Sequence, residues 1–410
     1  MRLAEVIESA VGRSAPLEFT AYDGSRTGDR GAPVRIDVRS PLALSHLASA
    51  PGELGLARAY VSGTLDIHGD MYTALKNMAV STVVGQVSPK VFAQVALRLG
   101  AARLWWPVPR PAGEARVHGR RHSRRRDQEV ITHHYDVSNR FYEWVLGPSM
   151  AYTCAVYPDA ASSLEEAQWT KHDLVARKLG LREGMRLLDV GCGWGGMVMH
   201  AAKHYGVRAL GVTLSRKQAE WAQKKIAESG LSDLAEVRHL DYRDVTESGF
   251  DAVSSIGLTE HIGEAALPSY VRSLYDKLRP GGRLLNHCIT RPDNRRPARI
   301  KGFFDRYVFP DGELLGPGHI ISAIHDNGFE VRHEENLREH YAKTLTAWCA
   351  NLDEHWDEAV EEVGEERARV WRLYMAGSRL GFEMNNIELH QVLAVKLDGT
   401  DSHMPLRPDW

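Results

Sequence analysis

The sequence has little of what marks secreted, membrane-spanning or metal-dependent proteins. Four cysteines occur in 410 residues and none forms a Cys-x-x-Cys spacing with another, so we expect a reduced, cytoplasmic setting with neither a disulfide framework nor a zinc site. No apolar run reaches the roughly eighteen residues that a membrane-spanning helix needs. Acidic side chains interrupt the apolar stretch of residues 1–8, which argues against a signal peptide.

A strong excess of charge is also absent. The formal net charge is −2, and 43% of the residues are hydrophobic and 25% are charged, which is typical of a globular protein with a sizeable core. The length suits two or three domains. The overall balance conceals one local excess, a run of arginines between residues 116 and 126.

The most informative stretch is a glycine-dense turn. Residues 187–196 read LLDVGCGWGG, an apolar strand that leads directly into Gly191, Gly193 and Gly195. Glycines let the backbone come close to a ligand, and the helix that follows presents unpaired N–H groups to it. The spacing is neither that of dinucleotide folds nor that of a phosphate loop. It therefore favours a nucleoside cofactor without a pyrophosphate, of which S-adenosylmethionine is the commonest; an ordinary tight turn is the alternative.

Residues 1–106 are predicted to form a small α+β domain. Alternating patterns predict strands at 17–22 and 34–38, two helical patterns follow, and a short strand is expected at 65–67. We find no catalytic constellation in this part of the chain. Packing, dimer contact or lipid contact is therefore its expected role.

Residues 107–127 read as a basic, proline-rich linker. It follows an amphipathic stretch at 91–99 and the pair Trp105 and Trp106, and together these features resemble an interfacial anchor that attracts anionic lipid head groups. A core helix followed by a solvated linker explains the same pattern. Nucleic-acid binding is disfavoured, because no aromatic platform accompanies the arginines. The arginines are Arg116, Arg120, Arg121, Arg124, Arg125 and Arg126.

Residues 128–410 alternate long helices with short apolar strands, which indicates a parallel α/β sheet. Ligands of such sheets lie beyond the carboxyl ends of the strands. The residues expected there are Gly191, Thr213, Asp241, Glu260 and His287. Aromatic residues between 303 and 374 either line a lid over an acyl-chain tunnel or simply form core. The predicted strands are 186–190, 209–214, 235–240, 250–256, 283–289 and 392–395.

Seven motifs in the chain carry a family resemblance. They are HYDVSN at 134–139, YTC at 152–154, LDVGCGWGG at 188–196, GVTLS at 211–215, EHIG at 260–263, YVFPDG at 307–312 and YAKTLTAW at 341–348. With them the chain resembles the cyclopropane-fatty-acyl-phospholipid synthase family, which includes mycolic-acid-modifying and methylene-forming methyltransferases. The resemblance implies a Rossmann-like S-adenosylmethionine-dependent methyltransferase domain with a helical acyl-chain lid, preceded by the small α+β domain of the longer, dimeric members.

The resemblance also implies a reaction and its residues. Methyl transfer to the cis double bond of an unsaturated phospholipid acyl chain leaves a carbocation, and a bound bicarbonate ion then removes a proton to close a cyclopropane. The positions that match the ion site are Glu260, His287, Tyr341, Cys154 and Ile289, the last two through their backbones. The positions that match cofactor contacts are Tyr135, Tyr152, Thr153, Asp189, Gly191, Gly193, Gly195, Thr213, Leu214, Gln218, Asp241 and Tyr242.

Two residues beside the expected ion site depart from the family pattern. Thr259 stands where an aromatic residue is usual, and Asn286 stands where leucine is common. Either change could alter which proton leaves the cation, so a methylene or methyl-branched product is the alternative to a cyclopropane. A non-catalytic lipid-binding protein and a small-molecule methyltransferase are further alternatives. We expect no metal, no nucleic acid, a possible homodimer, and peripheral association with the inner face of the membrane.

Overall fold

The structure is a computed structural model that divides into two compact units. It describes residues 2–5, 8, 16–50, 52–80, 108, 110–111, 113–115, 121, 123–124, 126–127, 138–295 and 299–410. The predicted stretch at 91–99, the tryptophan pair at 105 and 106, Tyr135, Arg116, Arg120 and Arg125 lie outside these residues. Unit 1 comprises residues 1–116, 301–308 and 352–380, and unit 2 comprises residues 117–300, 309–351 and 381–410.

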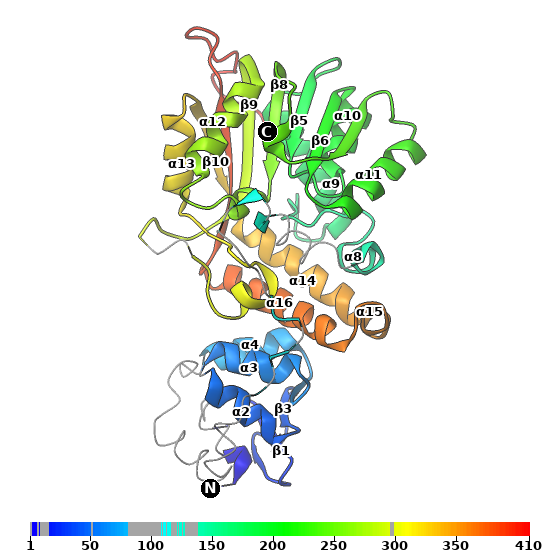
Figure 1. Ribbon diagram of the computed structural model, residues 1–410, viewed down its shortest axis with the longest axis vertical. Helices are drawn as coiled ribbons and strands as arrows, with labels where there is room; N and C mark the ends of the chain where they lie inside the picture. The colour runs from blue at the N-terminus through cyan, green and yellow to red at the C-terminus, as the bar shows by residue number, and fades with distance from the viewer. Residues whose placement is uncertain are drawn as a thin grey trace. The chain divides into compact units, whose positions relative to one another are not determined.

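Unit 1 contains a four-stranded sheet in the order β2-β1-β3-β4 (Figure 1). Strand β1 pairs antiparallel with β2 and parallel with β3, and β3 pairs antiparallel with β4. The side chain of Ser40 accepts a hydrogen bond from Leu42 N and begins helix α2, as a serine N-cap does. The elements are β1 Glu18–Ala21, β2 Arg26–Gly28, β3 Arg35–Val38, α2 Pro41–Ser49, α3 Glu53–Val61, β4 Leu65–His68 and α4 Met71–Val80.

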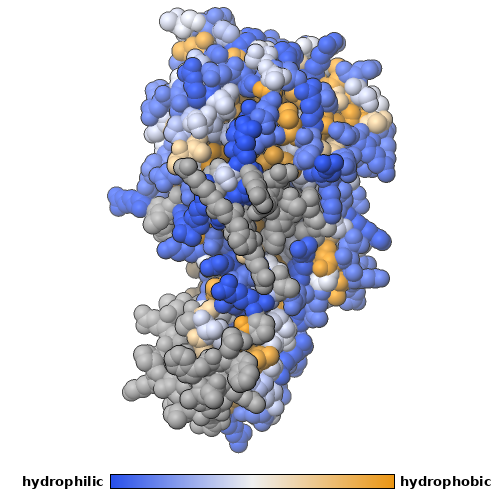
Figure 2. All heavy atoms as spheres, in the orientation of Figure 1, coloured by the Kyte–Doolittle hydropathy of each residue, from blue (hydrophilic) through white to orange (hydrophobic). Residues whose placement is uncertain are grey.

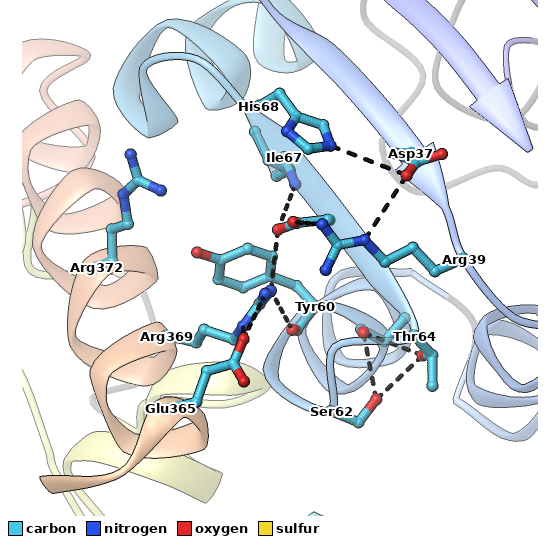
Figure 3. A network of polar contacts seen from close by, with 12 residues as sticks. Asp37, Arg39, Tyr60, Ser62, Thr64, Ile67, His68, Glu365, Arg369 and Arg372 are labelled. Carbon is cyan, nitrogen blue, oxygen red and sulfur yellow. Dashed lines mark hydrogen bonds and ion pairs between the residues drawn. The ribbon is translucent and has the colours of Figure 1, made fainter. Parts of the chain in front are cut away.

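Segments from far along the chain complete unit 1. They contain a π-helical turn at Phe304–Val308, helix α15 at Trp356–Val363 and most of helix α16 at Glu365–Glu383. Arg369 of α16 is buried, and it donates to Asp66 Oδ1 at 3.0 Å and to the Tyr60 carbonyl at 3.2 Å (Figure 3). The predicted boundary at residue 128 placed these helices with the catalytic domain. The ion pair between Arg369 and Asp66 joins α16 to strand β4 of the N-terminal sheet.

Unit 2 is built on a seven-stranded sheet in the order β10-β11-β9-β8-β5-β6-β7 (Figure 1). Strands β5 to β9 pair in parallel, and β11 pairs antiparallel with both β9 and β10. The strands are β5 Arg186–Val190, β6 Arg208–Thr213, β7 Ala235–His239, β8 Phe250–Ile256, β9 Leu278–Thr290, β10 Glu330–Asn336 and β11 Glu388–Val395.

Helices cover both faces of this sheet. Apolar side chains of α9, α10 and α11 pack on one face, and those of α12 and α13 pack on the other. The helices are α8 Asn139–Leu146, α9 Leu164–Leu179, α10 Gly196–Tyr205, α11 Arg216–Glu228, α12 Leu267–Lys277, α13 Pro317–Asp326 and α14 Arg338–Glu354, with 3-10 turns η1 at Tyr242–Asp244 and η2 at Thr259–His261. In the part of the chain that the structure describes, no helix is long and apolar enough to cross a membrane.

The predicted α/β class and parallel strands are confirmed. Strands β5 and β8 have the predicted bounds, because strands covered on both faces consist mostly of buried apolar or small residues. Strand β9 begins at Leu278 rather than at 283, and its register with β8 shifts between Phe250 and Ala252. Strand β10 was not predicted. It is an edge strand of mostly half-exposed polar residues, so it lacks an apolar run.

Candidate active site

A pocket opens in unit 2 at the carboxyl ends of β5, β6 and β8. It is lined by the turns that follow these strands, as expected for ligand sites of doubly wound sheets. Nine of the predicted cofactor residues line it: Tyr152, Thr153, Asp189, Gly191, Gly193, Thr213, Leu214, Gln218 and Tyr242.

The glycine turn after β5 forms one wall of the pocket. Gly191 has φ +73°, and a Cβ atom there would lie 3.1 Å from the Cβ of Leu258, so a side chain would strain the backbone and press against Leu258. Asp189 precedes the turn and is fully buried, and its Oδ1 accepts from Ser254 Oγ at 2.6 Å. Burial raises the pKa of Asp189 to about 6.

The turn after β6 forms a second wall. Thr213 Oγ1 donates to Gln218 Oε1 at 2.8 Å, and the Ser215 side chain accepts from Gln218 N at 3.3 Å to begin α11. These contacts hold the predicted pair Thr213 and Gln218 together. Two other predicted residues do not line the pocket. The Asp241 carboxylate receives the Arg243 guanidinium at 2.6 Å, and Gly195, at the N-terminus of α10, is enclosed by neighbouring side chains.

Glu260 lies directly beside the pocket, on the turn η2 after β8. Its Oε1 accepts from the backbone N–H of Ile289 at 2.7 Å, so the structure brings these two predicted ion-site residues together. Burial raises the pKa of Glu260 to about 7. The second carboxyl oxygen, Oε2, is buried without a hydrogen-bond partner. A buried unsatisfied oxygen is costly unless a ligand completes it.

His287 lies at the corresponding end of β9, opposite Gln391 of β11. Lys178 Nζ donates to Gln391 Oε1 at 2.8 Å, which fixes the amide so that its Nε2 donates to His287 Nδ1 at 3.1 Å. Nδ1 is therefore the acceptor, and the proton of the neutral imidazole is on Nε2. Burial, with the nearby Lys171 and Lys178 charges, holds the pKa of His287 well below its usual value. His287 Nε2 is buried without a hydrogen-bond partner.

Cys154 and Tyr341 lie on another side of the site. Cys154 is fully buried, its thiol donates to the Ala155 carbonyl at 3.2 Å, and burial raises its pKa, so the sulfur is not a nucleophile at neutral pH. Tyr341 packs edge-on against Trp348 with ring centroids 6.0 Å apart. The Trp348 ring in turn packs against that of Tyr152 in the pocket wall, with centroids 5.4 Å apart. These contacts place Tyr341 behind an aromatic wall of the pocket.

The arginine run ends at the pocket. Arg126 Nη2 donates to Asp311 Oδ1 at 2.8 Å, and Arg121 Nε lies 3.0 Å from the same oxygen. Asp311 lines the pocket, as do Asp127 and Arg243, which pair at 3.1 Å. Arg121 and Arg126 are therefore ion-paired at the pocket rim, which differs from a freely solvated linker.

Several residues of the candidate site were missed from the sequence. Lys171 and His172 of α9 line the pocket, and Lys178 and Gln391 orient His287. They belong to none of the short motifs, and lysines in a helix are usually predicted to face solvent. The spacing of Lys171 and Lys178 by seven residues, which places both on one helix face, is the signal that could have found them. In the described ranges no group of histidine, cysteine, aspartate and glutamate could hold a metal ion.

Comparison with known proteins identifies the family. The family model of mycolic acid cyclopropane synthetase matches residues 122–392. The chain belongs to this family. A probable fatty acid methyltransferase of Mycobacterium tuberculosis is 57% identical over 100% of this chain and 98% of its own length. The cyclopropane synthase MmaA2 from Mycobacterium tuberculosis and the mycolic acid cyclopropane synthase CmaA1 complexed with SAH and CTAB each match with a TM-score of 0.62 and 32% identity, over 66% of this chain and 98% of theirs.

Membership settles the enzyme class. The chain is an S-adenosylmethionine-dependent methyltransferase that modifies fatty acyl chains. The two synthase structures cover 98% of their own chains but 66% of this one, so about a third of this chain has no counterpart in them. The roles of the individual site residues stay predictions.

Proposed function

We propose that this methyltransferase adds a methylene unit to the cis double bond of an unsaturated acyl chain in phospholipid and closes a cyclopropane ring. The observation that carries the proposal is a pair of buried, unpartnered polar atoms beside the pocket, Glu260 Oε2 and His287 Nε2. Glu260 follows β8 and His287 lies on the neighbouring strand β9, with Ile256 of β8 opposite His287. Two polar atoms held without partners next to a cofactor pocket are suited to a small polar ligand.

The nine pocket-lining residues predicted to contact the cofactor fit S-adenosylmethionine. The turn at Gly191 allows backbone contact, and the first turn of α10 presents N–H groups. When bound, S-adenosylmethionine supplies an electrophilic sulfonium methyl group. The chain's own contribution is to hold this methyl in line with the double bond and to exclude water, because an alkene is a weak nucleophile.

The ion site fits bicarbonate. A bound bicarbonate ion would supply the base for the proton that the acyl cation loses. His287 offers an Nε2–H donor, which its contact with Gln391 enforces. Glu260, with a pKa of about 7, can stay protonated beside an anion and donate from Oε2. The backbone N–H of Ile289 donates to the other carboxyl oxygen, Oε1, and so fixes the orientation of the Glu260 carboxyl group.

Phospholipid is the proposed carrier of the acyl chain, presented at the membrane surface. An acyl chain held in a bilayer must reach the pocket from one side, and the rim there carries Arg121 and Arg126 near the pocket-lining Asp311. On the face seen in Figure 2 the described surface is mainly hydrophilic, with apolar side chains in scattered groups. A peripheral contact through the rim arginines, rather than insertion, is consistent with that surface.

A methylene-branched product is the second candidate. Thr259 Oγ1 donates to Asn286 Oδ1 at 2.6 Å, so the two departures from the family pattern form one buried hydrogen bond, and Thr259 directly precedes Glu260 in the chain. This polar pair replaces apolar surface near the proposed cation. A hydride shift before proton loss from the new methyl would then give a methylene branch.

The experiment is incubation with S-adenosylmethionine and a panel of oleoyl phospholipids, with free oleate as the comparison, followed by mass spectrometry and NMR of the lipids. We expect phospholipid to gain one CH2 unit with cyclopropane ring protons. The same gain with olefinic methylene protons would establish the second candidate. Modification of free oleate alone would contradict the phospholipid assignment, and no gain in any lipid would contradict the reaction.

A further inference from the structure

The proposed reaction produces one proton per turnover at the buried polar atoms of the ion site. Transfer of the sulfonium methyl forms one C–C bond, and ring closure releases one proton from the new methyl group. Glu260 Oε2 and His287 Nε2 are both buried, and His287 is 1% exposed. The proton must leave these groups before the next turnover. The inference below rests on the proposed function.

Lys171 is the titratable group that leads away from the ion site. It is 1% exposed, and its Nζ donates to Thr153 Oγ1 at 3.0 Å. The Thr153 methyl group packs against Gly257, whose N–H donates to the His287 carbonyl at 2.8 Å. Among the described residues no carboxylate pairs with Lys171. Burial lowers the pKa of Lys171 to about 8, so this amine can both take up and release a proton near neutral pH.

Three histidines continue from Lys171 toward the protein surface. Lys171 Nζ lies 2.9 Å from His172 Nε2. The His172 and His200 ring centroids are 5.7 Å apart, and those of His200 and His204 are 4.7 Å apart. His172 is 8% exposed, His200 is 6% exposed and His204 is exposed. We call His172, His200 and His204 the histidine row.

The surroundings of His200 favour its neutral form. Its Nε2 is buried without a hydrogen-bond partner and lies 3.9 Å from Asp173 Oδ1. Tyr205 OH donates to this Asp173 oxygen at 2.6 Å, and Arg177 pairs with the other one at 3.0 Å. Burial, with the neighbouring His204 and Lys171 charges, lowers the pKa of His200 to about 4 despite Asp173. The ring is therefore neutral at neutral pH.

We propose that Lys171 and the histidine row form the route by which the proton released in the reaction reaches solvent. Lys171 Nζ passes a proton to His172 Nε2, and the ring releases its other N–H proton outward. One water molecule bridges the distance from His172 to His200, as waters do between polar groups. His204 then delivers the proton to solvent. The freed amine of Lys171 takes up the proton from the ion site, so one proton enters and one leaves, with no change of oxidation state.

The test removes the imidazole of His200, the middle residue of the histidine row, and then adds imidazole to the solution as a replacement base. His200→Ala should lower turnover about 100-fold, the lower end of the range of proton-transfer effects, while the affinity for S-adenosylhomocysteine stays unchanged. Imidazole in solution should restore turnover to His200→Ala, and pyrazole, a ring of the same shape and much weaker basicity, should not. His200→Phe fills the space without carrying protons, so it should be slow and insensitive to imidazole. The exposed His325→Ala on α13 is the control.

The outcomes separate this inference from the proposed function. Wild-type turnover in His200→Phe overturns the route, as does a slow His200→Ala that responds equally to imidazole and pyrazole. If His200 variants do not fold, the exposed His204→Gln gives the same test, with a smaller loss that imidazole restores. A wild-type protein that alkylates no lipid overturns the proposed function and, with it, the route. A wild-type protein that does so while its variants are unaffected overturns the route alone.

Discussion

Gln391 donates a hydrogen bond to Nδ1 of His287 at 3.1 Å across the antiparallel pair β9 and β11. Lys178 Nζ donates a hydrogen bond to Gln391 Oε1 at 2.8 Å, which fixes the orientation of the amide. The Lys178 ammonium also pairs with Glu335 at 2.5 Å. This chain of contacts leaves only one tautomer of His287 satisfied. The buried Nε2–H donor of the proposed ion site is therefore set from outside the site.

The first prediction concerns this tautomer. Gln391→Glu replaces the amide donor with an acceptor, so His287 should move its proton to Nδ1 and Nε2 should lose it. We expect turnover to fall about 100-fold, as when an orienting partner is lost, while S-adenosylhomocysteine binding measured by calorimetry is unchanged. The same change at the exposed Gln223 is the control. Full activity in Gln391→Glu would show that the His287 tautomer does not matter.

The second prediction concerns Glu260. Glu260→Gln keeps an acceptor for Ile289 N but cannot exchange a proton, so cofactor affinity should be retained while turnover falls at least about 100-fold. Single-turnover alkylation of lipid measures the loss. Glu264→Gln, an exposed neighbour on the same loop, should leave turnover unchanged. Undiminished activity of Glu260→Gln would remove Glu260 from the ion site.

The third prediction is a pH dependence of stability. Burial raises the pKa of Glu260 from 4.5 to about 7. Between these values the folded protein retains a proton that the unfolded chain releases, so the contribution to stability is complete below pH 4.5 and is lost as the pH rises through 7. The slope for this group is about 1.4 kcal/mol per pH unit. Urea unfolding from pH 4.5 to 7.5 should show a shallower decline for Glu260→Gln; parallel curves would contradict it.

The fold was largely predictable for strands that are buried on both faces, because their residues are mostly apolar or small. Strand β8 matches the predicted residues 250–256, because all its residues except Asp251 are apolar or small and both faces of the sheet are covered. The edge strand β10 was not predictable, since only β11 pairs with it and its side chains alternate between partial and full exposure. Helix α16 was expected in the catalytic domain; the contact that assigns it elsewhere, Arg369 with Asp66, joins residues 303 positions apart.

The residues of the site that belong to pocket-lining motifs were predictable. The residues that orient a site residue through a hydrogen bond were not. The residues from Asp189 to Gly193 follow from the glycine turn, and most of them line the pocket. Lys178 and Gln391 could not be found in this way. A lysine on a helix and a glutamine in a strand are common at surfaces, and only the packing of α9 against the sheet buries both, to 0% exposure.

The fourth prediction concerns the product. Thr259→Val removes the donor to Asn286 and leaves Asn286 Oδ1 buried without this hydrogen bond, at a cost of about 1–3 kcal/mol. Because the pair lies beside Glu260, we expect the ratio of cyclopropane to methylene product, measured by NMR, to change while cofactor affinity does not. Thr259→Ser keeps the hydroxyl and should keep the wild-type ratio. Identical product ratios in Thr259→Val and the wild type would exclude this pair from product control.

The fifth prediction concerns unit 1. Arg369→Met removes a buried cation that joins α16 to Asp66 and to the Tyr60 carbonyl. Breaking a buried ion pair costs about 3–5 kcal/mol, and we expect the lower end because Arg39 still pairs with Asp66. Thermal unfolding followed by circular dichroism should show a lower midpoint, whereas the half-buried Arg367→Met on the same helix should not. Equal midpoints would mean that Arg369 does not hold α16.

The most direct test of the central claim is NMR of lipids after reaction with S-adenosylmethionine that carries 13C in its methyl group. The account predicts that the label enters the acyl chain of oleoyl phospholipid as a cyclopropane CH2 and that Glu260→Gln incorporates almost none. Absence of label from every lipid, with the cofactor bound, would contradict the account.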